Sequence, residues 1–263
     1  MKYGLIAVAI FTGCLSITSA SAQNKVVVIP LGKSGLKAVN DTSACDAAKA
    51  GTVRWTGSDF EGCNGTDWIV FSMPFGTVTS AGRVWMDRNL GASRVATSSS
   101  DMAAYGDLYQ WGRPTDGHEQ RTSPTMGTLS ATDVPGHGRF ITTSLSPFDW
   151  LTSQNDNLWQ GVSGVNNPCP AGFRLPTEAE WEIERASWSS NDAAGAYGSP
   201  LKLIRAGRRS YGDGTLGGLA SSGYYWSSTV NGNNSRILYF SGSSTFMYDF
   251  PRADGLSVRC LKD

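Results

Sequence analysis

Residues 168–188 have the sequence PCPAGFRLPTEAEWEIERASW, which carries the strongest local structural signals of the chain. Pro176 disfavours helical backbone at the residue before it, so residues 173–175 are predicted to be extended. A helix then begins, because Thr177 and Glu180 have the spacing of a capping box. We expect this helix to continue to the end of the stretch. The stretch therefore predicts a short strand that is followed directly by a capped helix.

The segment that follows this helix is rich in strand signals. Its aromatic and β-branched residues occur in short runs, and the runs are separated by polar turn residues. A second short helix, over residues 102–111 and capped by Asp101, is expected before it. Helices early and strands late predict an α+β domain with an antiparallel sheet, two short helices and long loops. The predicted strands are residues 224–229, 236–240, 245–250 and 256–261, with turns at 231–234 and 241–244.

The first half of the chain shows weaker signals of the same kind. One strand is expected at residues 83–86, and residues 74–82 before it are interpreted as a linker. Residues 115–158 are polar and rich in Gly and Pro, and a loop of this length in a compact domain is usually functional or packed by anchoring side chains. We expect Trp150 and Trp159 to be such anchors. Further strands are predicted at residues 25–31, 52–55 and 69–71, the last two joined through a turn at Asn64 and Gly65.

The chain begins with a short basic start, an apolar run over residues 4–17 and small residues at 20–22. This pattern predicts a secretory signal peptide over residues 1–22, with cleavage before Gln23. The apolar run of about 14 residues is shorter than the ~20 that a bilayer-spanning helix needs, so no spanning segment is expected. Lipoprotein processing at Cys14 stays open as an alternative. The protein is therefore expected to be exported to the periplasm, the cell surface or the extracellular space.

Composition limits the classes of partner. The 263 residues include 22 Lys and Arg against 22 Asp and Glu, so the formal net charge is zero. Recognition of nucleic acid or of anionic lipid needs a basic patch, and we expect neither partner. The hydrophobic content of 40% allows a packed core and argues against a disordered stalk. We divide the chain into a signal peptide (1–22), a small β-rich segment with a disulfide loop (23–80) and a main domain (81–263).

Four cysteines remain after the predicted cleavage, an even number that indicates two disulfides in an oxidising compartment. Three connectivities are open. We favour Cys45 with Cys63 and Cys169 with Cys260, because each pair then lies in its own part of the sequence. Zinc is disfavoured, since the chain has no Cys-x-x-Cys motif and only two histidines.

Five spaced motifs occur in order in the main domain. They are VWMDRNLG (84–91), YGDLYQWG (105–112), NPCPAGFRLPT (167–177), YWSST (225–229) and SVRC (257–260). This set resembles the Fibrobacter succinogenes major paralogous domain. That family is similar to the C-type-lectin-like and formylglycine-generating-enzyme folds, and to the variable proteins of diversity-generating retroelements. The resemblance implies a C-type-lectin-like domain with a ligand-binding surface near the C-terminus, and it implies function less strongly than fold.

Two rival functions find little support in the residues. A formylglycine-generating oxidase needs a reactive cysteine pair, whereas Cys169 and Cys260 lie in apolar, strand-like contexts that suit a structural bridge. His118 and Glu119 are expected to be a solvated loop pair, and no catalytic or metal-binding set is predicted. The chain also lacks the Glu-Pro-Asn or Gln-Pro-Asp loop and the Trp-Asn-Asp triplet of calcium-dependent lectins. No cofactor is expected, with calcium at a structural site left open.

The favoured function is a binding or adhesion module that recognises a protein or glycan ligand. A non-catalytic structural role in the bacterial envelope is the alternative. Binding residues usually lie on loops held by a rigid scaffold, and the two C-terminal turns mix aromatic, Arg and small polar residues as paratopes do. Because Phe246 and Tyr248 would share one strand face, either could instead point into the core. The predicted ligand-binding residues are Asn231, Asn233, Asn234, Arg236, Ser243, Phe246, Tyr248 and Asp249.

Overall fold

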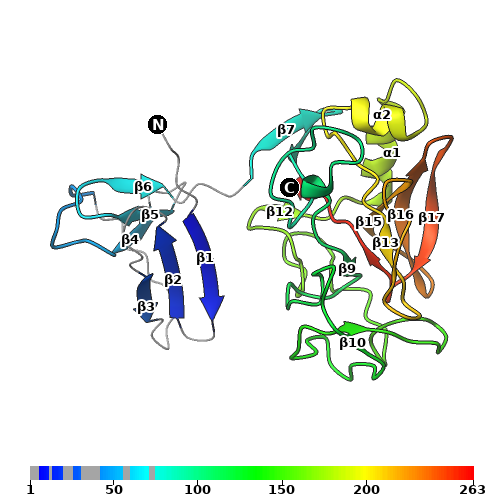
Figure 1. Ribbon diagram of the computed structural model, residues 1–263, viewed down its shortest axis with the longest axis horizontal. Coiled ribbons are helices and arrows are strands. Elements are labelled where there is room, and N and C mark those ends of the chain that lie inside the picture. Colours follow the sequence, from blue (N-terminus) through cyan, green and yellow to red (C-terminus); the bar gives the residue numbers. More distant parts are fainter. Residues whose placement is uncertain (1–5, 12–13, 20–25, 31–41, 56–59, 71–74) are drawn as a thin grey trace. The chain divides into compact units, whose positions relative to one another are not determined.

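In the first unit of the chain, Met1–Pro74, the described residues form two antiparallel three-stranded sheets. The computed structural model describes residues 6–11, 14–19, 26–30, 42–55, 60–70 and 75–263 of the whole chain (Figure 1). The predicted cleavage site before Gln23 lies outside these residues. The strands are β1 (Ile6–Phe11), β2 (Cys14–Ser19) and β3 (Val26–Pro30) in one sheet, and β4 (Val53–Trp55), β5 (Phe60–Cys63) and β6 (Trp68–Val70) in the other.

A disulfide closes the second of these sheets. The sulfurs of Cys45 and Cys63 are bonded, and their Cα atoms lie 5.4 Å apart. The turn between β5 and β6 is stabilised by Asn64, whose side-chain oxygen accepts hydrogen bonds from the backbone N–H groups of Thr66 and Asp67. The local disulfide and the turn at Asn64 are therefore confirmed. The turn joins β6 to β5, a strand that the sequence did not predict, and not to β4 as expected.

The second unit, Phe75–Asp263, contains both α-helices and three small antiparallel sheets (Figure 1). Strands dominate it, which agrees with the predicted α+β class. The first sheet has the order β12-β19-β8-β7, so the two ends of the unit pair with each other in one sheet. The second has the order β14-β13-β18-β9, and the third is the meander β15-β16-β17. A short parallel pair, β10 with β11, lies in the long loop region.

The elements of this unit have the following bounds. The strands are β7 (Thr77–Ser80), β8 (Arg83–Met86), β9 (Tyr109–Gln110), β10 (Thr125–Met126), β11 (Phe140–Ile141), β12 (Phe173–Arg174), β13 (Arg208–Arg209), β14 (Leu216–Gly217), β15 (Ser222–Asn231), β16 (Asn234–Ser241), β17 (Thr245–Pro251), β18 (Gly255–Leu256) and β19 (Leu261–Lys262). The helices are the 3₁₀ turn η1 (Met102–Ala104), α1 (Glu178–Ala186) and α2 (Ala193–Gly198).

The capped helix predicted from residues 168–188 is present as α1. The Thr177 hydroxyl accepts a hydrogen bond from the N–H of Glu180 at 3.3 Å, and the Glu180 carboxylate accepts one from the N–H of Thr177 at 2.8 Å. Arg174 on β12 donates two further bonds of 2.8 Å to the same carboxylate. These hydrogen bonds join the strand to the start of the helix, and they outweigh burial to lower the pKa of Glu180 to about 2.

The interpretation of residues 74–82 as a linker is wrong, because Thr77–Ser80 form β7 and pair with β8. Thr77, Val78 and Thr79 favour extended backbone, and a tight turn at Ala81 and Gly82 returns the chain into β8. Both turn residues have positive φ angles, 47° and 74°, as a two-residue hairpin of the commonest type requires.

The predicted helix over residues 102–111 is also wrong beyond its first turn. Asp101 caps it as expected, accepting a hydrogen bond from Ala103, but only η1 forms. Gly106 ends it at a φ of 66°, and a Cβ at that position would come within 2.4 Å of the Leu90 carbonyl oxygen. The second α-helix of the unit is instead α2, which begins where the Asp192 side chain caps the backbone of Ala194 and Gly195.

The predicted final strand, residues 256–261, is divided into β18 and β19. Between them Ser257 forms a bridge to Tyr225 of β15, and Arg259 is buried. The Arg259 guanidinium donates to the Leu201 carbonyl at 2.7 Å and to the Asn89 side chain at 2.8 Å. The chain therefore crosses from one sheet to the next through the core instead of continuing as one strand.

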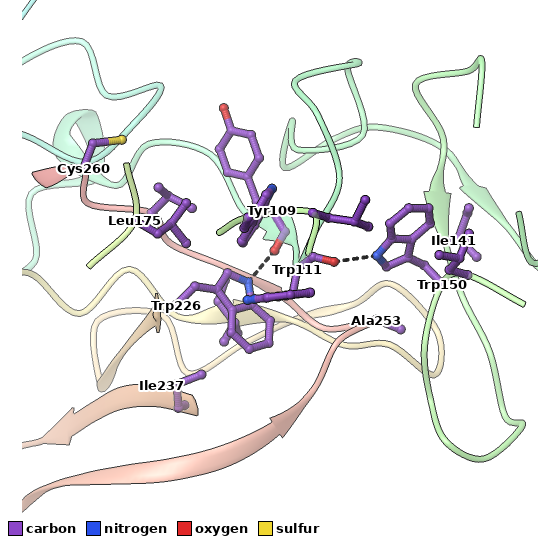
Figure 2. Close-up of a cluster of buried hydrophobic side chains, with 14 of the residues drawn as sticks. Tyr109, Trp111, Ile141, Trp150, Leu175, Trp226, Ile237, Ala253 and Cys260 are labelled. Atoms are coloured by element: carbon purple, nitrogen blue, oxygen red, sulfur yellow. Dashed lines mark hydrogen bonds between the residues drawn. The ribbon is translucent and has the colours of Figure 1, made fainter. Parts of the chain in front are cut away.

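Buried tryptophans hold the irregular parts of this unit to the sheets. The Trp226 indole N–H donates to the Tyr109 carbonyl at 2.7 Å, and that of Trp150 donates to the Trp111 carbonyl at 2.7 Å (Figure 2). Trp159, at the end of the long loop, donates to the Arg113 carbonyl before the loop at 3.2 Å and to the Asn166 carbonyl after it at 2.9 Å. Trp150 and Trp159 thus anchor the long loop as predicted.

The second disulfide joins the middle of the chain to its end. Cys169 and Cys260 are bonded across a sequence separation of 91 residues, with their Cα atoms 5.8 Å apart. The preferred pairing of all four cysteines is therefore confirmed. Both bridges fit a protein that folds in an oxidising compartment. Among the described residues, no helix has the length and apolarity to cross a bilayer.

Candidate functional site

The meander β15–β16–β17 presents two faces of different character. One face carries Tyr225, Leu238, Phe240 and Met247, which pack with residues of α1 and α2 in a hydrophobic cluster. The other face carries a set of neighbouring aromatic side chains, which we call the aromatic strip. It consists of Tyr224, Tyr239, Phe246, Tyr248 and Phe250.

The rings of the aromatic strip contact one another in a continuous series. Phe246 lies 4.9 Å from Tyr239 and 6.0 Å from Tyr248, measured between ring centroids. Phe250 lies 6.2 Å from Tyr248 and 5.6 Å from Tyr224. Successive rings are tilted or perpendicular, so together they form an uneven apolar surface instead of a flat platform.

The outer end of the aromatic strip is open to solvent. Phe246 is 42% exposed and Tyr248 is 54% exposed, and both lie on β17. Large apolar side chains that are exposed side by side on a folded surface commonly mark an interaction site. Both residues were predicted as ligand contacts, and the structure resolves the question of their direction: they share a face and point outward.

Arg236 lies on the opposite face of the same sheet and has fixed partners. Its guanidinium donates to Glu178 at the start of α1, at 2.6 and 2.8 Å, and to Asp249 at 2.9 Å. Asn231 donates to both oxygens of Asp249, at 3.1 and 3.0 Å. Burial acts to raise the pKa of Asp249, but the bonds from Arg236 and Asn231 outweigh it and hold the pKa below its usual range.

The two predicted turns lie at opposite ends of the sheet. Asn233 is in the turn between β15 and β16, and Ser243 is in the turn between β16 and β17. The eight residues of β16 separate the two turns, which corresponds to roughly 25 Å at the rise of an extended strand. The turn at Asn233 is also tied down, since Gln154 donates to its carbonyl at 2.9 Å.

The structure therefore groups the predicted residues in three places. Phe246 and Tyr248 belong to the aromatic strip, and Ser243 is exposed in the turn next to its open end. Arg236, Asp249 and Asn231 form the ion-pair network on the other face. Sequence reasoning missed the inner members of the strip, although the alternation of aromatic residues at 246, 248 and 250 is a signal for one apolar face. The remaining residues, Asn233 and Asn234, lie at the far turn.

A second group of polar residues is buried in the long loop region. His118 is fully buried and Glu119 nearly so, which corrects the expectation of a solvated pair. The His118 Nδ1 lies 2.6 Å from Asp116, and Nε2 accepts a hydrogen bond from the N–H of Gln110 at 3.1 Å. Arg113 donates to the other oxygen of Asp116 at 2.7 Å. Both imidazole nitrogens therefore have protein partners, and the group acts as a structural network that holds the loop to β9.

We expect His118 to stay neutral through the pH range in which free histidine gains a proton. Burial lowers the pKa of His118 from 6.5 to about 4, against a smaller opposing effect of Asp116. The unfolded chain binds a proton below pH 6.5 and the folded chain does not, so the contribution to stability is present above pH 6.5 and is lost as the pH falls toward 4.

An NMR titration of the imidazole protons tests this expectation. His137 is the only other histidine, so a His137→Gln variant assigns the signals. A midpoint for His118 close to its ordinary value would contradict the buried network.

A pocket also lies beside the end of α1, lined by Arg185, Ala186, Trp188, Ser190 and Asn191. Arg185 and Asn191 donate hydrogen bonds from here to the carbonyl of Thr245, the first residue of β17. The polar groups of these two side chains are thus already used in hydrogen bonds to β17. The aromatic strip remains the candidate site.

Comparison with known proteins identifies no relative of this chain. No family model, no curated protein and no solved structure matches it.

Proposed function

We propose that the chain is an exported, non-catalytic binding module that recognises a protein or glycan ligand through the exposed end of the aromatic strip. The observation that carries the proposal is the outward position of Phe246 and Tyr248 on one strand of a packed sheet. Aromatic residues dominate binding hot spots, because they bury a large area at a small cost in side-chain entropy. The scaffold beneath them is pre-organised by the helix packing on the other face, which reduces the entropy lost on binding.

The geometry of the rings favours a protein ligand over a glycan. The plane of Tyr248 is at 68° to that of Phe246 and at 64° to that of Phe250. Side chains of a protein partner can pack between rings set at such angles, whereas a row of sugar rings is better matched by parallel ring faces. Aromatic side chains are also enriched in protein–protein interfaces.

The resemblance seen in the sequence supports the same proposal. Each of the five motifs contributes a residue to one hydrophobic core cluster: Met86, Trp111, Leu175, Trp226 and Val258. We therefore propose a C-type-lectin-like unit that displays its binding surface on the C-terminal meander. In this arrangement the ligand contacts the face of the sheet that carries the aromatic strip. The predicted contacts at Asn233 and Asn234, in the turn at the other end of the sheet, contribute less to binding.

The double substitution Phe246→Ser and Tyr248→Ser is expected to abolish binding. Each hot-spot aromatic contributes about 2 kcal/mol or more, which corresponds to roughly 30-fold in Kd for each residue. The labelled protein is first used to probe arrays of purified glycans and of cell-surface proteins. The Kd of the strongest interaction is then measured for the wild-type chain and for the variant.

The chain offers a matched control for this experiment. Ile183 on α1 is 53% exposed and Leu216 on β14 is 40% exposed. These exposed fractions are similar to those of Tyr248 and Phe246, respectively. The double variant Ile183→Ser and Leu216→Ser should keep full affinity. Equal loss in both variants would indicate general apolar adhesion, and full binding by the first variant would exclude the aromatic strip. Absence of any ligand on either array would favour the structural envelope role.

A further inference from the structure

The meander has one closed edge and one open edge. On the closed side, the backbone of β15 bonds to Ser257, with Trp226 N–H donating to the Ser257 carbonyl and Ser257 N–H donating to the Tyr224 carbonyl. On the other side β17 is the last strand in the order of the sheet, and it forms the outer edge of the unit in Figure 1. A free strand edge is a template for pairing with another chain.

The hairpin between β16 and β17 determines which backbone groups of β17 point outward. Ser241 N–H donates to the Ser244 carbonyl at 2.8 Å, so these two residues form a hydrogen-bonded pair. Pairs alternate along antiparallel strands. Consequently Phe246 and Tyr248 bond to β16, whereas the N–H and C=O groups of Met247 and Asp249 point away from the sheet. Neither outward residue has a backbone partner among the described residues.

The two ends of the same edge are already blocked. The Thr245 carbonyl accepts hydrogen bonds from Arg185 at 3.1 Å and from Asn191 at 3.2 Å. Pro251 has no N–H, and its carbonyl accepts a bond from Asp254. The outward backbone N–H and C=O groups that have no partner therefore belong to two residues, Met247 and Asp249, which lie on either side of Tyr248.

From this pattern we infer that β17 pairs with β17 of a second copy of this chain, antiparallel and about a two-fold axis at Tyr248. In this register Met247 faces Asp249 of the second copy, so each free residue meets a free residue, and the blocked Thr245 meets the blocked Pro251. A register centred on Met247 would place Asp249 against the blocked Thr245. One centred on Asp249 would place Met247 against Pro251. Only the Tyr248 register satisfies both outward residues.

The side chains are compatible with this register. On one face Tyr248 lies opposite Tyr248 of the second copy, and Phe246 lies opposite Phe250; cross-strand aromatic pairs of this kind stabilise sheets. On the other face the only charged residue of β17 is Asp249, whose carboxylate already accepts hydrogen bonds from Arg236 and Asn231. The near-zero net charge of the chain also favours self-association. Pairing would join two aromatic strips into one continuous surface.

Cysteine cross-linking tests the register in the absence of any ligand. In a Cys14→Ser background the other four cysteines are in disulfides, so one introduced thiol is the only reactive one. Residues at a non-hydrogen-bonded pair have Cα atoms about 4.5 Å apart, within the range that a disulfide spans. Under mild oxidation Tyr248→Cys is expected to form a covalent dimer. Phe246→Cys should not cross-link to itself, but should do so when mixed with Phe250→Cys.

Sedimentation velocity supplies an independent measurement. The wild-type chain is expected to show a concentration-dependent dimer, and Tyr248→Lys should be monomeric, because like charges directly opposite each other destabilise a strand pair. Ile183→Lys on α1 is the control and should still dimerise. The inference would be overturned if Phe246→Cys by itself cross-linked as well as Tyr248→Cys by itself. A monomeric wild-type chain would also overturn it. Neither cross-linking nor sedimentation velocity uses a ligand. A negative result in these two experiments would therefore exclude the strand pairing without contradicting the proposed binding function.

Discussion

Replacement of Cys260 by Ser is expected to lower the free energy of unfolding of the second unit by about 4 to 5 kcal/mol, the value that the chain-entropy treatment gives for a loop this long. The bridge from Cys260 to Cys169 closes 91 residues, so its removal restores much conformational freedom to the unfolded chain. Cys260 is itself buried in the core, and an unpaired serine hydroxyl there adds a further cost.

Guanidinium unfolding of the variant, together with titration of free thiols, measures both consequences. The denaturation midpoint of the second unit should fall, and Cys169, which is only partly buried, should become reactive. Cys45→Ser is the control, because it opens a separation of only 18 residues in the first unit. A midpoint for Cys260→Ser that matched the wild-type value would show that packing alone fixes the end of the chain.

Substitution of Trp226 by Phe is expected to destabilise the second unit by about 3 kcal/mol, the combined effect of a cavity and a lost buried hydrogen bond. Trp226 is fully buried, and its N–H group donates to the Tyr109 carbonyl (Figure 2). Phenylalanine fills less of the site and donates nothing, so strand β9 loses one of its attachments. The melting temperature should fall by about 6–12 °C for a unit of this size.

Differential scanning calorimetry of the second unit's transition checks this expectation. Trp68→Phe makes the same chemical change at a partly exposed site, where the indole donates to the Ser43 carbonyl at 2.9 Å. Water can replace that bond, so the cost should stay below about 1 kcal/mol. Similar losses of stability in the two variants would mean that burial of the Trp226 hydrogen bond does not increase its contribution to stability.

Local signals in the sequence predicted the fold best where neighbouring residues act on each other. The capping box at Thr177 and the hairpin turn at Asn64 are both formed as expected. Predictions failed where a distant contact decides the backbone. Gly106 ends the predicted helix because the Leu90 carbonyl lies against it, and Arg259 divides the last strand by reaching Asn89 and Leu201.

The candidate site was predictable in its residue types but not in its arrangement. The strands of the meander follow from the sequence pattern, and Phe246 and Tyr248 are predicted as ligand contacts from their residue types. Which face of the sheet α1 covers is a tertiary property, so Arg236 was expected as a free anchor although it pairs with Glu178. His118 was likewise expected in solvent, although Gln110 and Asp116 contact its two ring nitrogens in the folded chain.

The indole anchors have a consequence for how this protein tolerates change. The path of the long loop is fixed at a few positions, notably Trp150 and Trp159, while Val134 and Leu145 before them and Val165 after them are exposed. Substitutions at the exposed positions alter what the surface presents without altering the attachments that hold its shape. Mutational scanning would therefore divide the loop into a small intolerant set and a large permissive one. New surfaces could be selected on the permissive positions while the core stays constant.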